Sequence, residues 1–243
     1  MSSNTLAILI TGSNQGLGYE AALQLSKHSH VHLFISGRDA SRVEEALAKI
    51  KSEDCKAKVQ SVIIDVSSDD SIRAAVSEVE KHLAGGPLDV LVNNAGVALS
   101  GDDLRKTFLD TYAINVFGAA CMANAFLPLL KKSKQVGGGR ILNISSGLGS
   151  VTRMADPSNS ASQRNLMVYN SSKSALNAIT VTLGMQHQDL HVVALAPGFN
   201  ATNLNKYRGT MDPKDGAKII VEHSLSKIGK SPGYYNKDGE LAW

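Results

Sequence analysis

Short apolar runs alternate with longer amphipathic stretches along most of the chain. The short runs are four to six residues long and are mostly apolar. Such runs are typical of strands buried on both faces of a parallel sheet. The predicted strands are Leu6–Ile10, Val31–Ser36, Val59–Ile64, Val90–Asn93, Arg140–Ile144 and His191–Ala196.

The stretches between these runs have the periodicity of amphipathic helices. In the second of them, Val43, Leu47 and Ile50 recur at helical spacing. The predicted helices are Gly16–Lys27, Ala40–Ser52, Ser71–Leu83, Leu104–Leu130, Val168–Gln186 and Pro213–Lys227. Strands that alternate with helices predict an α/β fold with a doubly wound parallel sheet and helices on both faces.

Three segments interrupt this alternation. The polar stretches Ser150–Met167 and Asn200–Asp212 are predicted to be loops. The tail Gly233–Trp243 predicts one more short strand and a turn at Asp238-Gly239. With no shift in composition to mark a boundary, we expect one Rossmann-type domain over residues 1–243, with about seven strands. We expect this domain to carry both the cofactor site and the substrate site.

Composition narrows the functional classes. The chain has 243 residues, 43% of them hydrophobic, and a net charge of +3 from charges spread along the sequence. This balance argues against binding to nucleic acid or to a membrane surface. The cysteines, Cys55 and Cys121, are predicted to form neither a disulfide nor a zinc site, and we expect no metal. Without an apolar run of 18 residues or a secretory signal, a cytoplasmic location is expected.

A glycine-rich turn follows the first predicted strand and precedes the first predicted helix. Glycines allow a tight turn in which backbone N–H groups and the helix N-terminus approach a pyrophosphate. A glycine cluster by itself also fits a surface turn, and its place between strand and helix favours nucleotide binding. The residues expected to contact the nucleotide are Gly12, Ser13, Asn14, Gln15, Gly16, Leu17 and Gly18.

Five motifs in order give the chain a family resemblance. They are Thr11-Gly12-x3-Gly16-x-Gly18, Asn93-Asn94-Ala95-Gly96, Asn143-Ile144-Ser145-Ser146, Tyr169-x3-Lys173 and Pro197-Gly198. With these motifs the chain resembles the short-chain dehydrogenase/reductase family over nearly its whole length, and in particular its carbonyl-reductase-like members. The resemblance implies hydride transfer between a nicotinamide cofactor and a carbonyl or alcohol.

Tyr169 is the expected catalytic acid/base. Lys173 follows one helical turn later, so both side chains lie on the same helix face. The lysine ammonium and an oxidised nicotinamide would favour the phenolate, and so we expect the pKa of Tyr169 to be lowered. By the resemblance, Ser146 donates a hydrogen bond to the substrate oxygen, and Asn115 holds a water that relays protons to Lys173. The alternatives are a structural helix tyrosine, a pair of strand-end serines and a buried asparagine bonded to backbone.

The second strand ends at Ser36-Gly37-Arg38-Asp39 and favours NADP(H) over NAD(H). The small Ser36 stands where an NAD enzyme usually has a carboxylate, and the Arg38 guanidinium suits a 2′-phosphate. The alternative is that Arg38 only pairs with Asp39. The resemblance implies that Tyr169 and Lys173 also contact the cofactor. It adds further cofactor contacts from Asp65, Val66, Asn93, Ala95, Gly96, Pro197, Gly198, Asn200 and Thr202.

One segment departs from the family pattern. Between Ser146 and Tyr169 lie 22 residues, more than typical members have, and we expect the extra length in Ser150–Met167 to shape the substrate pocket or an interface. Similar insertions occur in some monomeric members, so monomer, homodimer and homotetramer stay open. We expect a carbonyl reductase or alcohol dehydrogenase acting on a small molecule. Imine reduction and a non-catalytic NADP(H)-binding sensor or scaffold are the alternatives.

Overall fold

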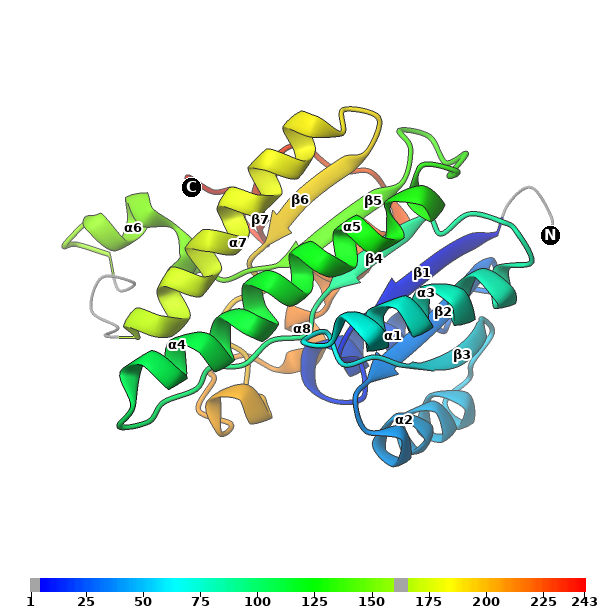
Figure 1. Ribbon diagram of the computed structural model, residues 1–243, viewed down its shortest axis with the longest axis horizontal. Coiled ribbons are helices and arrows are strands. Elements are labelled where there is room, and N and C mark those ends of the chain that lie inside the picture. Colours follow the sequence, from blue (N-terminus) through cyan, green and yellow to red (C-terminus); the bar gives the residue numbers. More distant parts are fainter. Residues whose placement is uncertain (1–4, 160–165) are drawn as a thin grey trace.

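The strands form one mixed sheet in the computed structural model, which describes residues 5–159 and 166–243. The strand order is β3-β2-β1-β4-β5-β6-β7-β8, and all neighbours are parallel except β7 and β8. Figure 1 shows the parallel strands β1–β7 running from right to left, so their carboxyl ends share one edge. The strands are β1 Leu6–Ile10, β2 Val31–Gly37, β3 Lys58–Ile63, β4 Val90–Asn93, β5 Arg140–Ile144, β6 His191–Leu195, β7 Gly233–Asn236 and β8 Gly239–Glu240.

Alternate residues of each central strand face two separate apolar layers. In β1, Leu6, Ile8 and Ile10 pack in one layer, while Ala7 and Leu9 pack in the other. This period of two explains why the run is apolar throughout. The first layer is completed by helices α1 (Gly16–Leu25), α2 (Ala40–Ser52) and α9 (Lys218–Leu225). The second is completed by α3 (Asp69–Leu83), α5 (Ala119–Leu130) and α7 (Met167–Gln186).

The fold class is therefore confirmed, with corrections at the ends of elements. The expected seven strands become eight, because the chain turns at Asp238 and adds the two-residue β8. Helix α3 begins two residues before the predicted Ser71, because Ser68 caps it by accepting a hydrogen bond from the Ser71 N–H. The expected helix Pro213–Lys227 is divided into α8 (Pro213–Gly216) and α9, and ends at Leu225.

The expected helix Leu104–Leu130 is continuous but not uniform. Helix α4 (Leu104–Tyr112) passes into a π-helical turn, Ala113–Gly118, before α5 begins. Periodicity does not reveal one wide turn inside a long apolar helix, and such turns are frequent at functional sites. This helix is long and apolar enough to cross a membrane, but half of its most apolar window is buried inside the protein. Its packing against the sheet is typical of a core helix.

The expected loop Ser150–Met167 is partly helical, which corrects the prediction. A 3₁₀ turn, Gly147–Gly149, leads into the short helix α6 (Val151–Ala155), which Ser150 caps by accepting a hydrogen bond from the Arg153 N–H. Residues 160–165 of the expected loop lie outside the described residues. The expected loop Asn200–Asp212 holds one 3₁₀ turn, Asn203–Asn205, and a bridge between Asn200 and Met211.

Candidate active site

The sequence-predicted site residues gather at the carboxyl edge of the sheet. The strand order reverses at β1, from which the chain runs outward through β2 and β3 on one side and through β4 onward on the other. At such a switch point the connections diverge and leave a crevice, where open α/β sheets bind their ligands. The glycine turn follows β1 at this point, three of the other motifs lie at the ends of β4, β5 and β6, and Tyr169-x3-Lys173 lies in the first turns of α7.

The glycine turn has a backbone that side chains would disrupt. Gly12 and Gly16 have φ angles of +61° and +59°, which residues with a Cβ rarely adopt. A Cβ on Gly18 would lie 2.4 Å from Nδ2 of Asn94 and 2.7 Å from the Gly12 oxygen. The sequence therefore needs glycine at these three positions, and the turn stays open enough for a ligand to approach its backbone.

The N-terminus of α1 offers donors for an anion. Its capping residue, Gln15, makes no side-chain hydrogen bond to the helix, so the first-turn N–H groups have no side-chain cap. Backbone donors together with the positive end of the helix dipole suit a diphosphate. Ser13 has a different role, because it joins the ends of β1 and β2. Its N–H donates to the Ser36 oxygen, and its hydroxyl donates to the Ile10 oxygen and accepts from the Ser36 N–H.

Asn94 is a residue of this site that the sequence analysis did not single out. Its Nδ2 donates to the backbone oxygens of Thr11 and Gly12, at 2.8 and 2.9 Å. The Thr11 hydroxyl in turn accepts from the N–H groups of Asn94 and Ala95. The β4 motif therefore holds the glycine turn in place, and the doubled asparagine after β4 was the available signal.

Arg38 is exposed at the end of β2, in keeping with a phosphate-binding role. Asp39 pairs with Arg42 at 3.8 Å, and no ion pair among the described residues includes Arg38. The alternative pairing of Arg38 with Asp39 is therefore not found. The positive charge of Arg38 instead influences Asp65. Hydrogen bonds from Ser67 are the main cause of the lowered pKa of Asp65, and the Arg38 charge lowers it further to a lesser extent.

The residues at the ends of β3 and β4 lie at the same edge of the sheet, and they differ in exposure. Asp65 is partly exposed, whereas Val66 is buried against Gly118 of the π turn. The Asn93 side chain lies within the fold, where its amide donates to Asn143 and to the backbone of Ala119. The expected neighbours Ala95 and Gly96 are partly exposed and follow it directly.

The segment after β6 approaches the glycine turn from the other side. Gly198 has a φ of +92°, and the Asn200 side chain donates to the oxygens of Pro197 and Gly198. Asn200 is thereby buried and shapes the loop with its side chain. Thr202 lies 3.6 Å from the position that a Cβ on Gly16 would take, so it faces the turn directly.

Ser146, Tyr169 and Lys173 come together beside this crevice. The Ser146 side chain lies close enough to the Tyr169 hydroxyl to lower its pKa, and the Ser146 Oγ accepts a hydrogen bond from the Leu148 N–H at 3.2 Å. Lys173 is 4% exposed, and its Nζ lies 5.8 Å from the Tyr169 ring centre. Ser145, in contrast, donates to Asn177 at 2.6 Å in the interior. Of the two serines, Ser146 is therefore the one that faces the tyrosine.

The pKa of Tyr169 departs from the sequence-based expectation. Although its side chain is only partly covered, burial of its hydroxyl raises the pKa to about 12, against the lowering effect of Ser146. Burial also lowers the pKa of Lys173 to about 8. Desolvation, and not the expected attraction of the lysine, therefore dominates the pKa of Tyr169, and its hydroxyl is protonated at neutral pH.

Asn115 lies in the π turn next to these residues. Its side chain bonds to both backbone groups of Val97, each at 2.8 Å, and donates to the Ser172 hydroxyl at 3.0 Å. Its Oδ1 and the Lys173 Nζ lie 3.4 and 3.5 Å from the position of a Cβ on Gly96. The Asn115 amide is thus bonded to the backbone, as the alternative of a buried asparagine predicts. It also lies beside Lys173.

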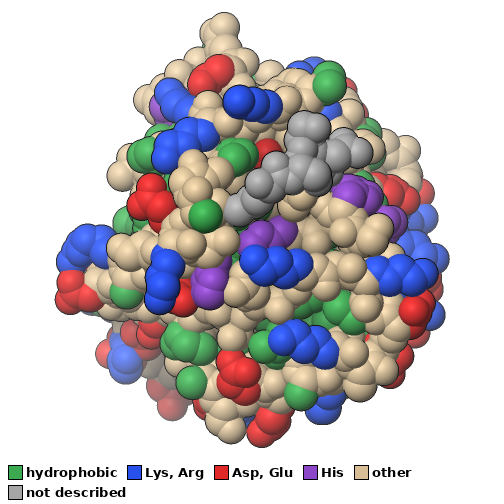
Figure 2. Space-filling view, turned by 90° about the vertical axis from the view of Figure 1, so that its right-hand side faces the viewer, with side chains coloured by type: hydrophobic (Ala, Val, Ile, Leu, Met, Phe, Trp, Pro, Cys, Tyr) green, Lys and Arg blue, Asp and Glu red, His purple; other side chains and the backbone are tan. Residues whose placement is uncertain are grey.

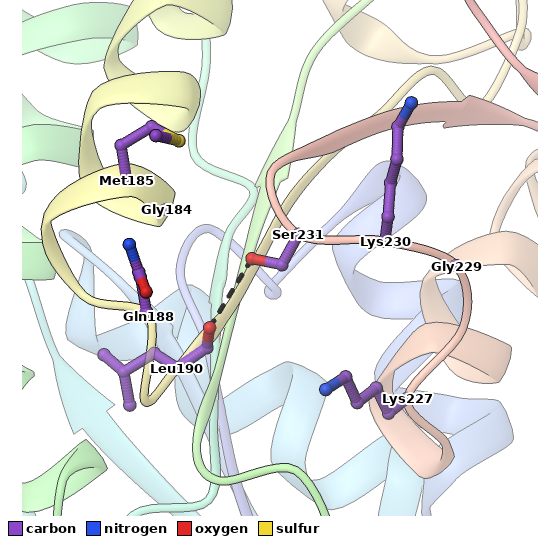
Figure 3. A pocket seen from close by; sticks show the side chains of 8 residues that line it. All are labelled: Gly184, Met185, Gln188, Leu190, Lys227, Gly229, Lys230 and Ser231. Carbon is purple, nitrogen blue, oxygen red and sulfur yellow. Dashed lines mark hydrogen bonds between the residues drawn. The ribbon is translucent and has the colours of Figure 1, made fainter.

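Other surface features lie away from this edge. A cavity of about 310 Å³ between the end of α7, the start of β6 and the 227–231 loop contains none of the predicted site residues (Figure 3). On the amino-end face, basic and acidic side chains are interspersed (Figure 2). Among residues 5–159 and 166–243, no group of three or more His, Cys, Asp or Glu side chains is arranged to hold a metal.

The fold and this edge define a Rossmann-type nucleotide-binding protein. The family model for short chain dehydrogenases matches residues 6–213. The short-chain dehydrogenase anuI of Penicillium roqueforti is 37% identical over 221 residues, which cover 88% of this chain and 86% of the relative.

Two solved structures are also similar. The NADPH-bound carbonyl reductase from chicken fatty liver has a TM-score of 0.85 and 27% identity, covering 99% of this chain and all of the other. The carbonyl reductase Sniffer of Drosophila melanogaster has a TM-score of 0.84 and 31% identity, covering 98% and 100%. The chain belongs to the short-chain dehydrogenase/reductase family, is carbonyl-reductase-like, and is an oxidoreductase.

Proposed function

We propose that this protein is an NADP(H)-dependent oxidoreductase that interconverts a carbonyl and an alcohol, with Tyr169 as acid/base. The observation that carries the proposal is the contact of Ser146 with the Tyr169 hydroxyl, beside the buried Lys173. In the direction of reduction, the protonated Tyr169 donates its proton to the carbonyl oxygen, while Ser146 hydrogen-bonds the same oxygen. The nicotinamide supplies the hydride.

Lys173 has two tasks in this proposal. Its Nζ already donates to the backbone oxygen of Ile144 at 2.8 Å, which fixes the ammonium between β5 and Tyr169. The remaining N–H groups are donors for ribose hydroxyls. Asn115 binds the backbone of Val97 and lies in the π turn beside Lys173. We expect the water that relays protons to Lys173 to lie at this wide turn.

The choice of NADP(H) rests on the end of β2. Arg38 is exposed and outside the ion pairs of the described chain, and no carboxylate occupies position 36. The Ser36 side chain is itself buried and donates to Ile10. The chicken carbonyl reductase, whose structure contains NADPH, is similar over the whole chain. A cytoplasmic location and a small carbonyl substrate agree with this proposal, in which one domain carries both sites.

The proposal is tested by mixing the protein with NADPH and a panel of aldehydes, quinones, diketones and imines. Nicotinamide absorbance reports turnover. We expect oxidation of NADPH with carbonyl compounds. Turnover with imines alone would favour an imine reductase, and tight NADPH binding without turnover on any compound would favour a sensor or scaffold.

A further inference from the structure

A second buried tyrosine lies beneath the loop that carries Ser146. Tyr234, on β7, is 0% exposed, and its hydroxyl donates to the backbone oxygen of Ser146. The hydroxyl also neighbours Ser145 and Asn177, whose amide donates to the Gly149 oxygen at 3.1 Å. Burial raises the pKa of Tyr234 to about 12, so this hydroxyl stays a donor at neutral pH. The proposed chemistry does not use it.

The segment 241–243 folds back over this tyrosine. The Trp243 and Tyr234 rings stack, with centres 5.3 Å apart and planes 20° apart. The Leu241 N–H donates to the backbone oxygen of Tyr234 at 2.7 Å, and Leu241 packs with Trp243 against Tyr234. A stacked, hydrogen-bonded partner limits the freedom of the Tyr234 ring and fixes the position of its hydroxyl.

The same segment also binds helix α6. The Ser150 hydroxyl donates to the oxygen of Ala242 at 2.7 Å, and Thr152 donates to the oxygen of Trp243 through both its hydroxyl and its N–H. Figure 1 shows the end of the chain between α6 and α7, far from α6 in sequence. Tyr234 therefore holds one end of the 3₁₀ turn at Ser146, and the segment 241–243 holds its other end and the start of α6.

We propose that Tyr234 and Trp243 are positioning residues, which fix the Ser146 backbone so that its hydroxyl meets Tyr169. The inference rests on the proposed function of Ser146. The Ser146 backbone oxygen accepts from both Tyr234 and the Gly149 N–H, while its Oγ accepts from Leu148. These bonds occupy the backbone oxygen and one lone pair of the Oγ. The Ser146 hydroxyl proton is then available to donate toward Tyr169 and the substrate oxygen.

The decisive variant is Tyr234→Phe, which keeps the ring, the stack and the core volume and removes only the hydroxyl. Losing one buried hydrogen bond that aligns a catalytic group should lower kcat roughly threefold to tenfold. The NADPH dissociation constant should stay unchanged, because the glycine turn lies on other strands. Trp243→Ala should lower kcat similarly, and Trp243→Phe should restore part of the loss by restoring a stacking ring.

Tyr235→Phe is the matched control. Tyr235 is the next residue on β7, and its hydroxyl bonds only to the Lys230 backbone in the opposite layer. A purely structural role for Tyr234 predicts equal effects of the two substitutions on kcat. Trp243 is the single tryptophan of the chain, so its fluorescence verifies that the segment stays docked in Tyr234→Phe.

Hydrogen exchange of the amides at 147–155 supplies a readout that does not depend on turnover. We expect faster exchange there in Tyr234→Phe and Trp243→Ala, and wild-type exchange in Tyr235→Phe. A wild-type protein without turnover on any carbonyl would refute the proposed function, and the exchange measurement would still decide the anchoring. An active wild type with unchanged kcat and exchange in Tyr234→Phe would overturn the positioning role alone.

Discussion

Individual side chains decide the chemistry through burial more than through charge. Tyr169 and Lys173 are shifted in opposite directions by the same cause, since desolvation opposes the phenolate and the ammonium alike. The sequence identified both residues and their shared helix face. It did not reveal the balance between burial and attraction, because burial depends on β5, the π turn and the 145–149 loop packing around them.

Lys173 should give the activity a limit on the alkaline side. Its pKa of about 8 means that the ammonium is present below pH 8 and is lost above it. We therefore expect kcat/KM for NADPH, which reports ionisations of the free enzyme, to fall as the pH rises through 8. Lys173→Met should be weakly active and lack this limb. A flat profile from pH 7 to 9.5 in the wild type would refute this role for Lys173.

Arg38 should select between the two nicotinamide cofactors. Removing a guanidinium that binds a phosphate costs roughly 1.5–3 kcal/mol, or about tenfold to a hundredfold in affinity. Arg38→Ala should therefore weaken NADPH binding by that factor and leave NADH binding nearly unchanged. Arg73→Ala is the control, because Arg73 is an exposed arginine of α3 that pairs with Asp70. Titration of both cofactors by fluorescence checks this, and an equal loss for NADPH and NADH would contradict it.

At the scale of elements, the glycine turn links cofactor binding to folding. Gly18→Ala would place a Cβ against Asn94 and the Gly12 oxygen. Such overpacking typically costs about 1–3 kcal/mol, and here it should also displace the turn. We expect a lower melting temperature together with weaker NADPH binding. Gly101→Ala, where the nearest atom is the Thr107 hydroxyl at 3.3 Å, should lower the melting temperature less and leave NADPH binding unchanged. Unaltered NADPH binding by Gly18→Ala would argue against the turn as the diphosphate site.

Elements were predictable where local pattern decides them. Strands β1, β4 and β5 and helix α2 have the predicted bounds, because their apolar period, turns and caps agree. The π turn and α6 were not predictable. The π turn lies inside an uninterrupted apolar helix, and α6 depends on contacts with residues 242–243, distant in the sequence.

At the scale of the whole molecule, the ends of the predicted strands were enough to locate the site. The distant residues that hold the Ser146 loop in place could not be predicted from the sequence. The five motifs occur in chain order at the carboxyl edge, where the topology brings them together. The anchoring of Ser146 by Tyr234 and Trp243 pairs residues that no local spacing connects. The expected strand in the tail was correct, yet its role beneath the catalytic loop emerges only from the packed structure.

The opposite edge of the sheet should make the protein sensitive to acid. His191 is buried near Arg140 and Lys227, and His223 is buried near His191; burial lowers the pKa of each histidine to about 4. Between pH 6.5 and pH 4 the unfolded chain therefore binds more protons than the folded protein. Stability is full above pH 6.5 and is lost as the pH falls, with each histidine adding at most about 1.4 kcal/mol per pH unit.

Urea unfolding between pH 7 and pH 4.5 measures this dependence. His223→Phe cannot take up the proton and should show a shallower loss of stability on acidification, whatever its stability at pH 7. His30→Gln replaces an exposed histidine and should keep the wild-type slope. Identical slopes for His223→Phe and the wild type would contradict the assignment.

The most direct test of the account is the turnover of Tyr169→Phe, measured beside its NADPH affinity. A positioned general acid contributes roughly a hundredfold to ten-thousandfold in rate. We expect Tyr169→Phe to lose at least about a hundredfold in kcat, to bind NADPH like the wild type, and to keep its melting temperature. Tyr207→Phe, at an exposed tyrosine, should remain fully active. Carbonyl reduction at the wild-type rate by Tyr169→Phe would contradict the assignment of Tyr169 as acid/base.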